Sequence, residues 1–294
     1  MAFSKGQVST EGAAVKRFIG VGSMFVRGVN PNKSESEAFF GRTMDTDPVY
    51  VSTVESNGAQ VPTVRISFLV EADPEIHNGI EFKSSVNIFL RREPRVSSAG
   101  KKQVIDKYGR TAWATPEEIA SHTVPVYSNG KKANLSPDYR VAYNGEEDLI
   151  KFLIAYINIP APANYVNGEW VPKSADELSN CEASLEHIED YFKGNFSELK
   201  EIISYQPLNK VKVCFGVRTA DDGKEYQNCY TRRFLKNSIT NYSSLDADIK
   251  ATQSAGGYST TTFDTEELHE YTVAPTNFNE VPFAQEAPTA SPWG

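Results

Sequence analysis

The feature that most constrains the fold is a pair of alternating segments around a tight turn, in the stretch LNKVKVCFGVRTADDGKEYQNCYTRRFLKN. The turn Asp221-Asp222-Gly223 predicts a three-residue loop in which the glycine takes the left-handed conformation. Such a loop places Ala220 opposite Lys224 and fixes the pairing register of the whole hairpin.

This register assigns every side chain of the hairpin to one of two faces. One face is largely apolar and is expected to pack on the core, with the pairs Val217–Gln227, Phe215–Cys229, Val213–Thr231 and Val211–Arg233. The other face is predicted to be exposed and carries Lys210, Lys212, Arg218, Tyr226, Tyr230, Arg232 and Phe234. A bulge elsewhere in the hairpin would exchange the faces and turn the rings into the core, with the cations reaching out to water.

Alternating cations and rings are typical of a platform for single-stranded nucleic acid. The cations neutralise phosphates, and each unpaired base that stacks on a ring contributes about 1–3 kcal/mol. A second segment, residues 81–113, holds 8 bases and 3 acids. The residues of this segment that we expect to bind nucleic acid are Arg91, Arg92, Arg95, Lys101, Lys102, Lys107, Tyr108, Arg110 and Trp113.

The remaining charge is acidic and segregated along the chain. The formal net charge of −8 argues against a general nucleic-acid binder. Residues 144–204 hold 12 acids and 4 bases, and residues 251–294 hold six acids and no base. Chance patchiness of a solvated surface is the alternative to a functional reading of this pattern.

Periodicity predicts an α+β chain that is mainly β. Apolar alternation over 15–30, 60–73 and 80–92 predicts strands, whereas residues 145–157 repeat with a helical period. Ser174 with Glu177 predicts a capped helix that ends at Gly194, and FSELKEIIS predicts a third helix. We therefore expect an OB-like barrel over residues 1–250, a helical insertion at about 144–204, and a disordered tail over 251–294.

Motifs of common enzymes and metal sites are missing from the sequence. There is no phosphate loop, no HExxH and no GxSxG, and the cysteines Cys181, Cys214 and Cys229 lack metal-ligand spacing. The odd cysteine count and the lack of a signal or membrane-spanning pattern favour a reducing cytoplasm. The sequence thus predicts a protein that is not an enzyme, has no cofactor and no metal, and does not enter a membrane.

Four stretches carry a resemblance to a known family: GVGSMFVRGVNPNKSESEAFFGR, VIDKYGRTAWATPEE, HIEDYFKGNFSELKEII and KVKVCFGVRTADDGKEYQNCYTRRFL. Together they resemble proteins of crAss-like gut bacteriophages over most of residues 1–250. The resemblance implies a role in phage replication, with single-stranded DNA binding in the cytoplasm of the bacterial host.

The end of the chain has a likeness of its own. Glu280-Val281-Pro282-Phe283 is similar to the acidic, aromatic tip of bacterial single-stranded-DNA-binding proteins, although it lies eleven residues before the end. We expect this tail to recruit replication proteins through Phe278, Glu280, Pro282, Phe283 and Trp293. The alternative function is a virion structural or assembly protein, whose tail would be an assembly arm. A homo-oligomer is compatible with either function.

Overall fold

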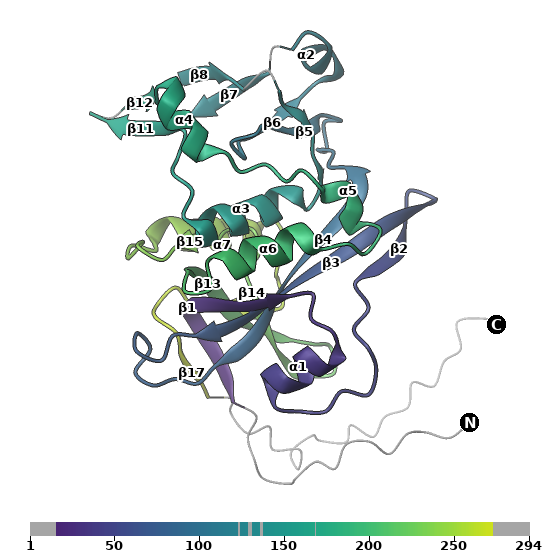
Figure 1. The fold of residues 1–294 in the computed structure, drawn as a ribbon, viewed down its shortest axis with the longest axis vertical. Coiled ribbons are helices and arrows are strands. Elements are labelled where there is room, and N and C mark those ends of the chain that lie inside the picture. The colour runs from purple at the N-terminus through teal and green to yellow at the C-terminus, as the bar shows by residue number, and fades with distance from the viewer. Residues whose placement is uncertain (1–15, 123, 129–130, 136–137, 168, 273–294) are drawn as a thin grey trace, which may run out of the picture.

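The computed structural model describes residues 16–122, 124–128, 131–135, 138–167 and 169–272. Its main sheet is antiparallel and curls into a half-barrel (Figure 1). The path through this sheet is β10 (Tyr143–Asn144), β4 (Lys83–Pro94), β3 (Ala59–Ala72), β1 (Arg17–Val29), β13 (Lys210–Thr219) and β14 (Glu225–Cys229). Four more strands join its sides: β2 (Val51–Ser56) on β3, β15 (Leu235–Lys236) and β16 (Thr261–Phe263) on β13, and β17 (His269–Tyr271) on β1.

The strands follow the alternation in the sequence. In β3, Val64, Ile66, Phe68 and Val70 point into the core and are fully buried. Residues between them point to the opposite face, because successive strand side chains alternate. The strands predicted at 15–30, 60–73 and 80–92 are confirmed, and so is the α+β, mainly β class.

Two helices, α3 (Glu146–Ile157) and α6 (Ser197–Tyr205), cover one face of the sheet (Figure 1). The ring of Phe152 in α3 stacks on Phe68 of β3 with centroids 4.1 Å apart. Burial of one such side chain contributes about 1.5–3 kcal/mol. The predicted helical face of α3 is therefore its contact with the sheet.

The single helix predicted from Ser174 to Gly194 is wrong. The capping box of Ser174 and Glu177 is present, but α4 (Ala175–Leu178) ends after one turn and passes into the 3-10 turn η1 (Ser179–Cys181). The next helix, α5 (Ile188–Tyr191), begins after an interruption in which the Ala183 amide donates to the Lys107 carbonyl at 2.7 Å. This contact with a distant segment takes the place of a helical hydrogen bond.

Short elements form the opposite end of the molecule from the first helix, α1 (Lys33–Phe40) (Figure 1). A three-stranded sheet and a helix enclose a small core of their own: β5 (Lys102–Ile105), β6 (Thr111–Ala114), β9 (Arg140–Val141) and α2 (Pro116–Ala120). Two separate hairpins lie nearby: β7 (Pro125–Ser128) with β8 (Lys131–Asn134), and β11 (Ala163–Val166) with β12 (Glu169–Pro172). In the described part of the chain, no helix has the length and apolar character needed to cross a membrane.

The hairpin of β13 and β14 confirms the predicted turn and half of the predicted register. The Ala220 amide donates to the Lys224 carbonyl, Gly223 has a φ of +75°, and Phe215 faces Cys229. The Tyr230 amide still donates to the Cys214 carbonyl, as predicted, but beyond Tyr230 the register is wrong, because Lys212 pairs with Leu235 instead of Arg232, a shift of three residues.

An odd shift moves side chains to the opposite face of a sheet. Phe234 therefore enters the main core, where its ring lies 5.0 Å from that of Phe152. Tyr230 is fully buried in a second core with Cys214. The exposed positions predicted for Tyr230 and Phe234 are both wrong. Phe234 is buried because of this shift, whereas Tyr230 keeps its predicted place opposite Cys214 and is buried because α7 (Ser243–Ser254) covers that face.

The helix α7 (Ser243–Ser254) and the strands after it cover this second core. The chain around Glu267 and Thr262 passes so close to the sheet that two glycines are needed beneath it. A Cβ on Gly20 would lie 2.7 Å from the Glu267 carbonyl oxygen, and one on Gly216 would lie 2.4 Å from that of Thr262. Gly20 also has a φ of +116°, which other residues avoid.

The predicted start of the tail at residue 251 is also wrong. Residue 251 lies inside α7, and β16 and β17 pair with the main sheet up to Tyr271. Four of the six acids assigned to the tail, Asp264, Glu266, Glu267 and Glu270, thus belong to the folded body. Phe278, Glu280, Pro282, Phe283 and Trp293 lie outside the described residues.

Two tyrosines on one face of the hairpin test whether α7 covers part of that face. Tyr230 is 0% exposed and Tyr226 is 46% exposed. Tyr230→Ala should lower the free energy of unfolding by about 3–5 kcal/mol, as a large core truncation does. Tyr226→Ala should change it by less than about 0.5 kcal/mol. Urea unfolding measures both, and equal effects of the two substitutions would contradict the burial of Tyr230 beneath α7.

Candidate nucleic-acid interface

The basic segment 81–113 is partly neutralised by ion pairs, three of which are with the acidic helical block. Arg92 pairs with Glu189 at 3.1 Å, and Lys107 with Glu182 at 2.8 Å. Three further cations of the segment also pair with carboxylates: Arg95 with Glu147 at 2.8 Å, Arg110 with Asp106 at 2.7 Å, and Arg91 with Glu93 at 3.7 Å. The alternation of basic and acidic stretches in the sequence is thus explained in large part by ion pairs within the body.

Three other residues of this segment have charged or aromatic groups that reach the solvent. Lys101 and Lys102 make no ion pair with any carboxylate of the described residues, and Trp113 is partly exposed beneath the Arg95 guanidinium. Tyr108 lies between two cations, with Lys107 at 5.3 Å and Arg110 at 5.4 Å from its ring.

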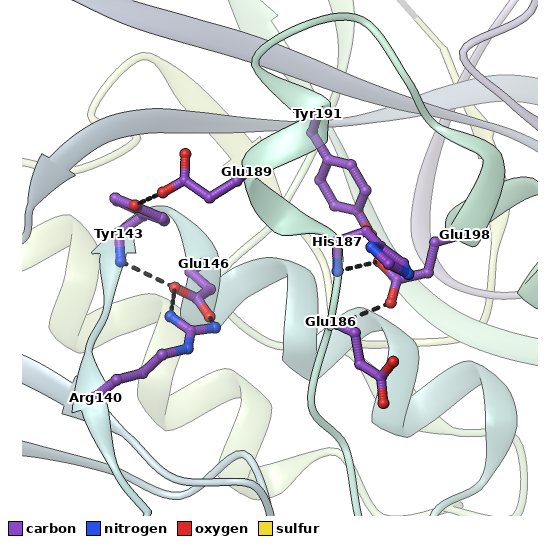
Figure 2. A network of polar contacts seen from close by, with 8 residues as sticks. All are labelled: Arg140, Tyr143, Glu146, Glu186, His187, Glu189, Tyr191 and Glu198. Atoms are coloured by element: carbon purple, nitrogen blue, oxygen red, sulfur yellow. Dashed lines mark hydrogen bonds and ion pairs between the residues drawn. The ribbon is translucent and has the colours of Figure 1, made fainter.

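Acids of the helical block are also satisfied internally (Figure 2). The carboxylate of Glu146 is fully buried, and it accepts two hydrogen bonds from Arg140 and one from the Tyr143 amide at 2.9 Å. Glu198 accepts from the amides of residues 186 and 187 and from the Tyr191 hydroxyl. These carboxylates hold the fold together rather than forming an open acidic surface.

Removing the partner of a buried carboxylate lowers the free energy of unfolding far more than removing the partner of an exposed carboxylate. Arg140→Ala leaves the buried Glu146 carboxylate unpaired and should lower the free energy of unfolding by about 3–5 kcal/mol. The matched control Arg92→Ala frees the half-exposed Glu189 and should cost no more than about 1 kcal/mol. Chemical denaturation compares them, and similar costs would contradict a structural role for Glu146.

The predicted seven-residue platform on the hairpin is not assembled. Lys210 pairs with the buried Asp73, and Lys212 donates to the Tyr242 hydroxyl at 2.9 Å. Since Tyr230 and Phe234 are buried, the residues of the platform left exposed are Arg218, Tyr226 and Arg232. Arg218 stacks on Tyr226 at 5.9 Å from its ring centroid, which leaves a single exposed ring on that face.

A different surface brings cations and rings together. A groove of about 720 Å³ lies between the segment after α1, the strand β4, and the strand β14. Its cations are Lys16, Arg17, Arg42, Arg65 and Lys83, against the single acid Glu81. Its aromatic residues are Phe18, Phe40, Phe82, Phe89 and Tyr258. We call this surface the β4 groove.

Three guanidinium groups of the β4 groove have no carboxylate partner among the described residues: those of Arg17, Arg42 and Arg65. Arg42 stacks on Phe40 at 5.2 Å, and Arg65 on Tyr50 at 5.3 Å. The Nε atoms of Arg17 and Arg65 are buried and find no acceptor in the described structure. A buried unsatisfied donor costs about 1–3 kcal/mol. Arg17 and Arg65 are only partly buried and line the groove, so the rest of each guanidinium group suits an incoming anionic oxygen.

Phe89 is the ring of this groove that stands out most. It is 56% exposed in the middle of β4 and faces Arg65 across the β3–β4 ladder. It shares one strand face with Lys83, Ser85 and Asn87, all polar. Phe89 was not predicted as a site residue. In KSSVNIFLRR it occupies one of the alternate positions that are otherwise polar, and this pattern indicates an exposed aromatic ring.

The buried His77 lies beside Ser23, but its Nε2 accepts a hydrogen bond from the Ser23 amide at 2.8 Å. That lone pair is unavailable to a hydroxyl, and burial also lowers the pKa of His77. No group of three or more His, Cys, Asp or Glu in the described part of the chain could hold a metal ion.

No family model, no curated protein and no solved structure matches the chain. The geometry and chemistry of the β4 groove are therefore the basis for proposing a function.

One carboxyl near the end of the groove responds to pH. Asp148 lies in the first turn of α3, and burial raises its pKa to about 6, with Lys151 opposing the shift. An unfolded chain has an Asp pKa of about 3.9. Ionisation of Asp148 therefore opposes folding above pH 6, and this cost is relieved as the pH falls towards 4.

The substitution Asp148→Asn removes that cost. It should raise the free energy of unfolding by about 1–3 kcal/mol at pH 7.5, and the gain should vanish near pH 4. Thermal unfolding of the variant and the unsubstituted chain across this pH range measures the difference. A constant difference from pH 4 to pH 7.5 would show that Asp148 does not titrate as described.

Proposed function

We propose that the protein binds single-stranded DNA in the β4 groove, without catalysis, as part of a phage replication system. The observation that carries the proposal is the set of arginines without a described carboxylate partner, Arg17, Arg42 and Arg65, in the same groove as the exposed Phe89. Guanidinium groups suit phosphate oxygens, and an exposed ring suits an unpaired base. The half-barrel then serves as an OB-like support for the strand.

The local charge of the β4 groove outweighs the overall charge of the chain. Five cations and one acid line it, although the whole chain has a formal charge of −8. The acidic block lowers the net charge, but many of its carboxylates form ion pairs within the protein. Duplex DNA presents its bases only at the groove edges, so stacking on Phe89 favours a single strand over a duplex. The resemblance to crAss-like phage proteins supports the same function.

The alternative function is a virion structural or assembly protein, and one observation favours it. The hairpin of β11 and β12 pairs with no other strand of the described chain and exposes Val166 and Val171. Exposed apolar side chains on such a hairpin are typical of a contact surface. Isolation of the protein from purified phage particles, together with a failure to bind oligonucleotides, would favour this function over DNA binding.

The test of DNA binding is a fluorescence titration with oligo-dT at several salt concentrations. Phe89→Ala should weaken binding by at least about 5-fold, the loss of one stacked base, with little change in the melting temperature because the ring is exposed. Arg42→Gln should also weaken binding and should reduce the salt slope by about one, since it removes one phosphate contact.

Arg92→Gln is the matched control, because Arg92 already pairs with Glu189 and lies outside the β4 groove. It should leave both the affinity and the salt slope unchanged. If Arg92→Gln weakens binding as much as Arg42→Gln does, the groove is not the site. If the unsubstituted chain fails to bind a single strand at low salt, the proposed function is wrong.

The proposal does not depend on the end of the chain, because the groove lies wholly within the described residues. Recruitment of replication proteins by Phe278, Phe283 and Trp293 stays a prediction from the sequence.

A further inference from the structure

The wall of the β4 groove leads directly to another set of exposed cations. Thr231 and Tyr258 line the groove, with the Tyr258 hydroxyl 2.9 Å from the Thr231 hydroxyl. The next residue, Arg232, is exposed and makes no ion pair with a described carboxylate. Its carbonyl oxygen accepts a hydrogen bond from the Lys151 ammonium at 3.4 Å, so the first turns of α3 lie against this end of the groove.

From Lys151 the charged side chains continue to an exposed indole. Lys151 and Arg95 both pair with Glu147 at 2.8 Å, and the Arg95 guanidinium lies 5.6 Å from the centre of the Trp113 ring. Trp113 is 39% exposed. The acids on this route are Glu147, which is mostly buried, and Asp148.

The charge of this route favours phosphate. The three cations Arg232, Lys151 and Arg95 outnumber the two carboxylates, of which Glu147 is already engaged by two of them. The opposite direction, over the tip of the β13–β14 hairpin, is less favourable. Its cavity of about 540 Å³ sets Asp221 and Asp222 beside Arg218 and Tyr226. Asp222 pairs with Lys224 at 2.8 Å, so the carboxylate of Asp221, which makes no ion pair with a described residue, is the group that repels a phosphate chain there.

We infer that a longer single strand leaves the β4 groove past Arg232 and Lys151 and ends with a base stacked on Trp113. This inference rests on the proposed function. Phe89 in the groove and Arg95 lie six residues apart, which at about 3.3 Å per residue is roughly 20 Å along β4 and its end. A strand must extend by about this length beyond the groove to reach the neighbourhood of Arg95. The distal segment is therefore occupied only by an oligonucleotide long enough to reach it, and it then adds to the affinity as a tethered second contact.

Length dependence tests the inference. Oligo-dT of about 6 nucleotides fills the groove, whereas oligo-dT of about 20 nucleotides also reaches Trp113. Trp113→Ala and, separately, Arg232→Gln should weaken binding of the longer oligonucleotide by about 5-fold or more, and should change binding of the shorter one by less than about twofold. Phe89→Ala, within the groove, should weaken binding of both lengths.

Tryptophan fluorescence gives a readout that does not depend on a large truncation. The longer oligonucleotide should quench the emission of the full chain more than the shorter one does, and Trp113→Phe should remove that difference while leaving the melting temperature nearly unchanged. Tyr226→Ala is the control for the hairpin tip and should bind both lengths as the unsubstituted chain does.

The outcomes separate the two proposals. If Phe89→Ala weakens both lengths while Trp113→Ala and Arg232→Gln bind the longer oligonucleotide normally, the groove is correct and the route to Trp113 is wrong. If Tyr226→Ala weakens only the longer oligonucleotide, the strand leaves over the hairpin tip and the route is again wrong. If the unsubstituted chain binds neither length, the proposed function itself fails.

Discussion

The fold depends on the strand β13, which is paired on both sides over most of its length. One side carries β1 and then β16, and the other carries β15 and then β14. Between β14 and β15 the register shifts by three residues, so Tyr230 and Phe234 enter two different cores on opposite faces of the sheet. The main core carries α3 and α6, whereas the second carries α7 and the strands that follow it. Among the described residues no ladder joins β14 to β4, and the groove lies where the half-barrel remains open.

Many charged side chains also form pairs between segments that lie far apart in the sequence. Part of the basic segment and part of the acidic helical block meet in space and pair. By contrast, Arg17, Arg42 and Arg65 of the β4 groove face a cavity without a described carboxylate partner. Their presence beside an exposed Phe89 makes this groove the best candidate for an anionic, base-bearing ligand.

Local features of the sequence predicted the parts of the fold that short-range chemistry controls. The turn at Gly223, the cap at Ser174 and the alternation of β3 each specify their structure within a few residues. The faces of the hairpin beyond Tyr230 could not be predicted in this way. They depend on β15, and its pairing with Val211 and Lys212 reflects contacts with α3 and α7. The folded state of residues 251–272 was missed for a similar reason, because β16 and β17 are short strands stabilised by the sheet they join.

None of the residues predicted from the sequence to bind nucleic acid lines the β4 groove. Local composition located cations and rings but could not show that Arg92 and Arg95 have acidic partners about 50 to 100 residues away. The β4 groove gathers its residues from both ends of the chain, from Arg17 to Tyr258, and no local window of sequence contains them together. A basic, aromatic surface that binds single strands stays a proposal. Its location is now the β4 groove, whose lining residues differ from those that the sequence indicated.

The most direct test of this account is hydrogen–deuterium exchange of the full chain with and without oligo-dT. A strand bound in the β4 groove should slow exchange at the amides of residues 83–89 and 227–231, and should leave the hairpin of β11 and β12 unchanged. Unaltered exchange over residues 83–89 and 227–231 at a saturating concentration of oligonucleotide, with protection elsewhere, would contradict the assignment of the groove as the DNA-binding site.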